Sequence, residues 1–205
     1  MGADDDINTF GRIPCLSQLR QEWPLPLVPG GNTPFFVIAD ARVHQDTLLG
    51  ERWVPTFPRA RYLVARPEWE YWSQSEEHWS QIVMADSIRP IFEAGLVDLV
   101  GVHHVVHETI RFEPTPGHTP GHVSVHIASQ GEEAVITGDL VHHPCQFARP
   151  DWGSSADADP AQADRTRKAF MVRYADTPTL IIGTHFAGPT AGRLVRDGDA
   201  YRLAV

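Results

Sequence analysis

The sequence predicts an α+β fold for this chain of 205 residues. Two observations support this class. In several segments apolar and polar residues alternate with the two-residue period of a strand, and segments with the start signals of a helix lie between them. The chain contains no internal repeat and no low-complexity tract. Strands and helices are therefore expected to mix along it.

The expected strands are short and are either apolar or alternating. They cover residues 35–39, 61–65, 105–112, 122–128, 134–137 and 179–183. A terminal hairpin is expected where residues 192–195 and 200–203 flank the turn Arg196-Asp197-Gly198-Asp199.

Three helices are expected between these strands. One opens near Pro67, because proline is favoured in the first turn of a helix. A second covers residues 87–94 and ends at Gly95. A third runs from residue 161 to about residue 174, with Asp159 as its N-cap and Pro160 at its first position.

Composition excludes several classes of function. The net charge of −9 argues against non-specific binding to nucleic acid. No stretch approaches the roughly 20 apolar residues that cross a bilayer, and the acidic start MGADDDINTF does not resemble a secretory signal. Cys15 and Cys145 form no spaced pair, which favours a reducing compartment. We therefore expect a cytoplasmic protein.

The first part of the chain differs from the rest. Repeated proline and glycine at residues 13–15 and 22–31 break any helical or strand period. The pattern becomes regular after this region. We expect a divergent, irregular segment at residues 1–46 and one folded domain at residues 47–205.

Three short segments follow one pattern: a strand is followed by a tight turn that carries His or Asp, and a glycine lies one or two positions before that residue. They are Thr115-Pro116-Gly117-His118, Ile136-Thr137-Gly138-Asp139 and Ile182-Gly183-Thr184-His185. Strands fix the backbone, and the glycine lets it turn so that the side chain can face a cleft. Two histidines and an aspartate at strand ends are typical of a zinc or di-metal hydrolytic site. The alternative is three capped turns whose polar side chains are satisfied locally.

Other polar residues have simpler interpretations. We expect His126 to lie on the less buried face of its strand. We expect the carboxylates Asp151, Asp157 and Asp159 to form a solvated acidic loop before a helix, without a chemical role. Cys145 lacks the partners of a nucleophile and is expected to be a buried thiol.

The runs PTPGHTPGH, ITGDLVHHP and IIGTHFAGPTAGRLV resemble the C-terminal half of the metallo-β-lactamase-fold hydrolases. The resemblance is greatest to the branch with acyl-homoserine lactonase-like and organophosphate hydrolase-like members, and residues 53–62 and 68–72 share it. It covers residues 47–205 and implies an αββα sandwich with metals at strand ends along one edge.

The resemblance also implies site residues. His118 would bind the first metal, His185 the second, and Asp139 would be the bridging carboxylate and the catalytic residue. The second histidine of GHTPGH is usually not a ligand in this family, so His122 is expected to make structural hydrogen bonds. Substrate contacts are expected from His142, His143 and Phe186. For the two histidines, the alternative is a purely structural role.

The chain departs from the family at the HxHxDH signature, which supplies two histidines to one metal and an aspartate and a histidine to the other. No HxHxDH occurs in the sequence. Residues 37–42, VIADAR, stand where it belongs, and nearby Asp40 and His44 lack the right spacing. We hypothesise a frameshift or a retained intron across residues 11–46, with a late start codon.

The missing motif limits the expected metal site. With His118, Asp139 and His185 alone, each of two metals has about two ligands, against the three of a usual catalytic zinc site. We expect one or two zinc ions, bound weakly or not at all. Missing N-terminal strands would also expose an apolar face and an edge strand, so we expect poor solubility or a homodimer that covers that edge.

The expected function is hydrolysis of an ester, lactone or phosphoester by zinc-activated water, impaired by the loss of half of the metal ligands. The alternative is a truncated or catalytically inactive protein of the same fold, with a binding role or no independent role. A redox or persulfide-type enzyme with one iron ranks last. The expected partner is a small-molecule substrate, not nucleic acid or a membrane.

Overall fold

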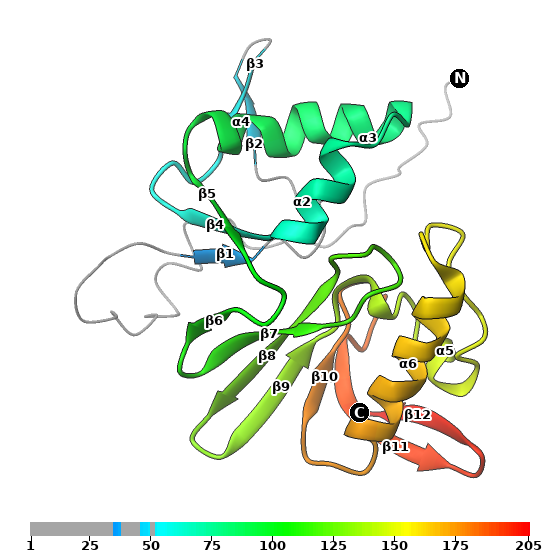
Figure 1. Ribbon diagram of the computed structural model, residues 1–205. Helices are drawn as coiled ribbons and strands as arrows, with labels where there is room; N and C mark the ends of the chain where they lie inside the picture. Colours follow the sequence, from blue (N-terminus) through cyan, green and yellow to red (C-terminus); the bar gives the residue numbers. More distant parts are fainter. Residues whose placement is uncertain (1–34, 38–45, 50–51) are drawn as a thin grey trace, which may run out of the picture. The chain divides into compact units, whose positions relative to one another are not determined.

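The computed structural model describes residues 35–37, 46–49 and 52–205 (Figure 1). These residues form a three-stranded sheet, a seven-stranded sheet and a separate two-stranded hairpin. Residues 1–34, 38–45 and 50–51 lie outside the described residues, and with them Cys15, Asp40, His44 and most of the segment expected to be irregular. No helix in the described ranges is long and apolar enough to cross a membrane.

The small sheet is parallel and has the order β1-β4-β5. Its strands are β1 (Phe35–Val37), β4 (Arg61–Ala65) and β5 (Val97–Val100). Four consecutive residues of β4 are buried, as expected for a parallel strand that is covered on both faces. The hairpin consists of β2 (Asp46–Leu49) and β3 (Arg52–Pro55).

Helices cover one face of the small sheet. They are α2 (Arg66–Ser73), α3 (His78–Val83) and α4 (Arg89–Glu93), with a π-helical turn at Met84–Ile88 between the last two. Tyr62 and Val64 of β4 pack against Ile88 and Ile91 in one buried cluster. This face of β4 therefore belongs to a helix–sheet core.

The large sheet has the order β12-β11-β10-β9-β8-β7-β6. Its strands are β6 (Val105–His107), β7 (Ile110–Pro114), β8 (Val123–Ser129), β9 (Glu132–Ile136), β10 (Leu180–Ile182), β11 (Ala191–Asp197) and β12 (Ala200–Ala204). All neighbours are antiparallel except β9 and β10, which are parallel. A parallel pair needs a long crossover, and α6 (Pro160–Tyr174) provides it.

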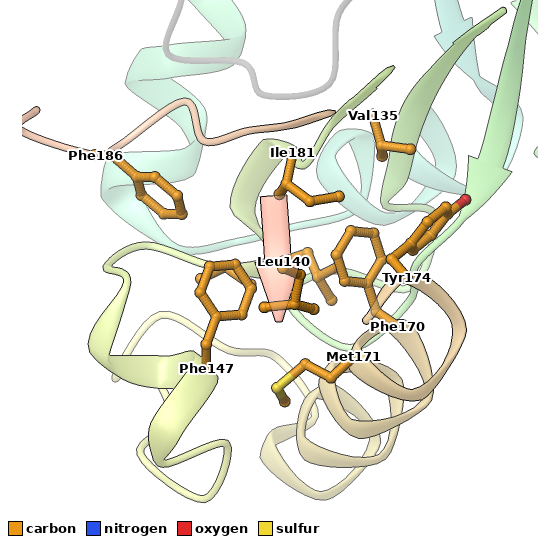
Figure 2. Packing of buried hydrophobic residues seen from close by; sticks show 10 residues of the cluster. Val135, Leu140, Phe147, Phe170, Met171, Tyr174, Ile181 and Phe186 are labelled. Atoms are coloured by element: carbon orange, nitrogen blue, oxygen red, sulfur yellow. The ribbon is translucent and has the colours of Figure 1, made fainter. Parts of the chain in front are cut away.

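A second helix–sheet core lies between the large sheet and its helices. Phe170 and Met171 of α6 share one buried cluster with Ile181 of β10 and with Phe147 of α5 (Cys145–Ala148) (Figure 2). Because α6 buries only one side, its opposite side carries exposed residues such as Val172. The crossover helix is thereby fixed on the sheet.

The two sheets also pack against each other. Leu63 and Ala65, on the other face of β4, share a buried cluster with Phe112 of β7 and Val123 of β8. The order of layers is thus helices, small sheet, large sheet, helices. This confirms the expected α+β class and αββα sandwich.

The sheet topology brings three loops to one edge. Ile136, the last residue of β9, pairs with Ile182, the last residue of β10, and with Val125 near the start of β8. The segments that follow β9 and β10 and the segment that precedes β8 therefore emerge on the same side. These are the segments that carry Asp139, His185 and His118.

Most expected elements are confirmed, and one is wrong. Residues 105–112 do not form a single strand but the hairpin β6–β7, with a turn at Glu108 and Thr109. That turn contains neither glycine nor proline, and the Thr109 hydroxyl and the Nδ1 of His107 lie 3.0 Å apart across it. A turn closed by side chains lacks the usual sequence signal.

Asp159 is the N-cap of α6, since its Oδ1 accepts a hydrogen bond from the backbone N–H of Gln162 at 2.9 Å. Replacement Asp159→Ala removes this acceptor and should lower the free energy of unfolding by about 1 kcal/mol. Asp159→Asn should retain most of the stability because asparagine caps equally well. Urea unfolding followed by far-UV circular dichroism measures both. Equal losses in the two variants would contradict the capping role.

Candidate metal centre

The three residues expected as metal ligands converge at the loop edge of the large sheet. Asp139 lies in the 3₁₀ turn Gly138–Leu140 directly after β9. Its Oδ2 is 3.1 Å from Nε2 of His118, and its Oδ1 is 2.6 Å from Nε2 of His185. His118 and Asp139 are buried, whereas the His185 side chain is 37% exposed. One carboxylate thus faces two imidazoles, one on each oxygen.

Glycine is required beside these residues for two different reasons. Gly117 and Gly138 have positive φ angles of 136° and 57°, which L side chains rarely adopt. A Cβ on Gly117 would also collide with the backbone of Ala163 in α6. At Gly183 the limit is space alone, since a Cβ there would collide with the ring of Phe186.

His122 holds the main chain of Asp139 in place. Its Nε2 accepts the backbone N–H of Asp139 at 2.9 Å, so the ring proton is on Nδ1, which donates to the carbonyl oxygen of Thr115 at 3.1 Å. Nδ1 also lies 2.8 Å from the Thr115 hydroxyl. Complete burial lowers the pKa of His122 to about 4. The expected structural role of His122 is confirmed.

Asp157 corrects one expectation. Its side chain is fully buried, and its Oδ1 lies 3.2 Å from Nδ1 of His118. The other oxygen accepts hydrogen bonds from Arg167 at 3.2 Å and from the backbone N–H of Ser154 at 3.1 Å. Burial opposes the charge on Asp157, but these donors outweigh it and lower the pKa of the carboxyl. The expectation of a solvated loop was wrong for Asp157, because its carboxylate forms a buried ion pair with Arg167 of α6.

The Asp157 contact determines how His118 presents its ring. A carboxylate at Nδ1 favours a proton on that nitrogen, so that Nε2, which faces Asp139, can bind a metal as in carboxylate–histidine–zinc arrangements. Burial opposes a charge on His118, but Asp139 and Asp157 outweigh burial and raise the pKa of its imidazole. Sequence reasoning missed Asp157, whose only signal is its place in a turn just before α6.

Glu68 of α2 holds the same loop from the other side. Its Oε2 accepts a hydrogen bond from the hydroxyl of Thr119 at 2.6 Å, and its Oε1 accepts one from the indole N–H of Trp72 at 2.7 Å. Burial raises the pKa of Glu68. A Cβ on Gly121 would collide with the backbone of Glu68. Sequence analysis did not find Glu68, because nothing in the local pattern of α2 indicates its contact with a loop 51 residues away.

The three residues expected to contact substrate have different positions. The His142 ring lies 5.2 Å from the His118 ring and 5.0 Å from the His185 ring, so His142 belongs to the site. His143 is exposed, and its Nδ1 accepts the backbone N–H of Cys145 at 3.1 Å. Phe186 is only 5% exposed and packs edge-to-face on Phe147 in the core.

His126 lies outside the site and differs from its expectation. It is 2% exposed, not on a less buried face, and its Nε2 is 3.5 Å from a carboxylate oxygen of Glu133. The strand β8 is central in the sheet, and residues of α6, among them Tyr174, line the same cavity as His126. Both faces of β8 are therefore covered, so the alternation of apolar and polar residues along the strand does not indicate which residues are exposed.

The donor set suits a zinc-type ion. Donor atoms of His118, Asp139 and His142 all lie within 4.8 Å of one another. Burial lowers the pKa of His142, and the nearby His118 and His185 add to this effect, so the ring tends to be neutral and able to donate a lone pair. Imidazole and carboxylate are ligands that zinc accepts in catalytic sites. The residues present therefore fit a metal.

The low pKa of His122 makes stability depend on pH. The unfolded chain binds a proton at an ordinary pKa of 6.5 and the folded chain only at about 4, so this contribution to stability is full above pH 6.5 and is lost as the pH falls toward 4. Over that window the metal-free wild type should lose about 3 kcal/mol more unfolding free energy than His122→Asn. Urea unfolding at a series of pH values checks this, and parallel curves for the two proteins would contradict it.

Comparison with known proteins agrees with this geometry. The family model of the metallo-beta-lactamase superfamily matches residues 46–185, which include His118, Asp139 and His185. A comparison with curated proteins finds no match.

Several solved structures share the fold. AidC, described as a dizinc quorum-quenching lactonase in complex with a product N-hexnoyl-L-homoserine, is 25% identical, with a TM-score of 0.64 over 73% of this chain and 56% of that one. The hydrolase AbOPH of the beta-lactamase superfamily is 24% identical, with a TM-score of 0.64 and the same coverage. A probable metal-dependent hydrolase from Staphylococcus aureus is 21% identical, with a TM-score of 0.62 over 83% of this chain and 62% of that one.

The chain thus spans less than two thirds of the length of each of these three proteins. The family model covers more than half of the chain, and the matched part includes the loops that hold its buried histidines and aspartates. The protein belongs to the metallo-beta-lactamase superfamily.

Proposed function

We propose that this protein is a metal-dependent hydrolase that acts on an ester, a lactone or a phosphoester. The observation that carries the proposal is the Asp139 carboxylate, which faces Nε2 of His118 on one oxygen and Nε2 of His185 on the other. Membership of the superfamily and the likeness to a dizinc lactonase support it. The substrate classes follow the resemblance to lactonase-like and organophosphate hydrolase-like members.

His118, Asp139 and His185 would hold the metal. The chemistry that a zinc ion held there would supply is a lower pKa of a water molecule, toward about 7, and polarisation of a carbonyl or phosphoryl oxygen of the substrate. Asp139 is the residue that both imidazoles contact, which makes it the central catalytic residue of the proposal.

Neighbouring residues position these three. Asp157 holds the proton of His118 on Nδ1, and His122 holds the main chain of Asp139. His142, whose ring lies beside that of His118, and the exposed His143, the next residue in the chain, would contact the substrate. Phe186 supports the turn of His185 from the core, since its ring packs beneath Gly183.

A second candidate is a binding protein of the same fold without catalytic turnover. The observation that favours it is the absence of HxHxDH from the sequence, which removes four of the ligands that the family signature supplies. The two candidates differ in turnover, whereas both allow a folded scaffold and a small-molecule ligand.

Asp139→Ala removes the carboxylate that joins the two imidazoles. Purified wild-type protein should retain at least one zinc per chain after dialysis and hydrolyse one class among acyl-homoserine lactones, p-nitrophenyl esters and phosphotriesters. The variant should lose the zinc and lower hydrolysis by more than about 100-fold, because even outer-shell partners of a metal ligand contribute 10–100-fold. Atomic emission and initial rates measure the two effects.

Asp151→Ala serves as the control, since Asp151 is exposed and its carboxylate pairs with Arg149 on the surface. It should keep both zinc and activity. Zinc far below one per chain in the wild type would exclude the hydrolase. Zinc retention without turnover of any of the three classes would favour the binding protein.

A further inference from the structure

We infer that His142 is a metal ligand, and that His118, Asp139, His142 and His185 together form one site for a single divalent ion of the zinc type. The inference rests on the proposed function only in requiring that the protein bind a metal. It assigns His142 to the metal instead of to the substrate.

Distance is the first argument. The donor atoms of His118, Asp139 and His142 lie within 4.8 Å of one another. Two ligand atoms on one tetrahedral zinc ion, each about 2.0–2.2 Å from it, are about 3.3–3.6 Å apart. Shifts of the side chains by about 1 Å would therefore bring all three onto one ion.

His185 lies beside this group, but among the described residues only the donor atoms of His118, Asp139 and His142 all lie within 4.8 Å of one another. The Nε2 of His185 is 2.6 Å from Oδ1 of Asp139, and its ring is stacked on that of His142 with 5.0 Å between centroids. Three imidazoles and one carboxylate offer three nitrogen donors and one negative charge. Zinc accepts ligands of both kinds in catalytic sites.

The unsatisfied ring of His142 is the second argument. Its Nδ1 is buried and has no hydrogen-bond partner among the residues that the structure describes. Buried polar atoms are normally paired, and exceptions call for an explanation such as an ion. Ligation of an ion through Nδ1 would account for the missing partner.

The backbone of His142 is held independently of any ion. Its N–H donates to Oε1 of Gln146 at 2.7 Å, and Nε2 of Gln146 in turn donates to the carbonyl oxygen of Trp152 at 2.7 Å. Gln146 is 5% exposed. His142 is therefore placed in advance, as a metal ligand needs to be.

The number of donors favours one ion over two. Two ions in a di-metal site lie about 3.5–4 Å apart and each needs its own ligands. The four donors found among the described residues would leave two ions with about two or three contacts each, whereas a single ion could take all four in the usual tetrahedral number. HxHxDH, which would supply the remaining ligands, does not occur in the sequence.

Zinc titration of the metal-free protein against a chromophoric chelator tests the inference without an activity assay. The wild type should bind one zinc per chain. His142→Ala should raise the zinc Kd by more than about 100-fold, since loss of a direct ligand should exceed the 10–100-fold cost of losing an outer-shell partner. His103→Ala, which removes an exposed histidine, should leave the Kd unchanged and is the matched control.

Cobalt spectra give a second readout on the same proteins, and far-UV circular dichroism verifies that each variant is folded. His142→Ala should weaken the visible cobalt bands, whereas His103→Ala should not. An unchanged zinc Kd in His142→Ala overturns the inference, as do two ions of similar affinity in the wild type. If Asp139→Ala abolishes binding while His142→Ala leaves it intact, the inference fails and the proposed function stands. Absence of zinc binding in the wild type overturns both.

Discussion

The Asp139 carboxylate contacts the imidazole of His118 through one oxygen and that of His185 through the other, and the Asp139 backbone N–H donates a hydrogen bond to His122. This arrangement depends on three segments that are far apart in the sequence and meet only because β9 lies between β8 and β10. A buried carboxylate is unfavourable unless it is paired. The buried Asp139 carboxylate at this sheet edge therefore requires the imidazoles as partners, or an ion between it and them.

The loop with His118 links the site to both helical layers. Asp157 and Arg167 connect His118 to α6 on the outer face of the large sheet, and Glu68 connects Thr119 to α2 above the small sheet. The helical layers of the αββα sandwich thus contact the His118 loop directly. Because each layer holds one side of the same loop, loosening either layer would move His118 relative to Asp139.

The parts of the site that sequence reasoning identified are those with a local signal. The glycines near His118, Asp139 and His185 mark positions that require glycine, for its backbone conformation or for space, and the strands beside them are apolar or alternating. Asp157, Glu68 and the burial of His126 escaped, because each depends on a contact with a distant helix or on a neighbouring strand. The β6–β7 turn escaped because side chains, and not glycine, close it.

Diffraction data collected on both sides of the zinc absorption edge, from crystals grown with zinc, would locate the metal. We expect an anomalous peak in contact with Asp139 and with the imidazoles of His118 and His185. A peak confined to other residues, or a zinc-containing crystal with no peak at Asp139, would contradict the assignment of this sheet edge as the metal centre.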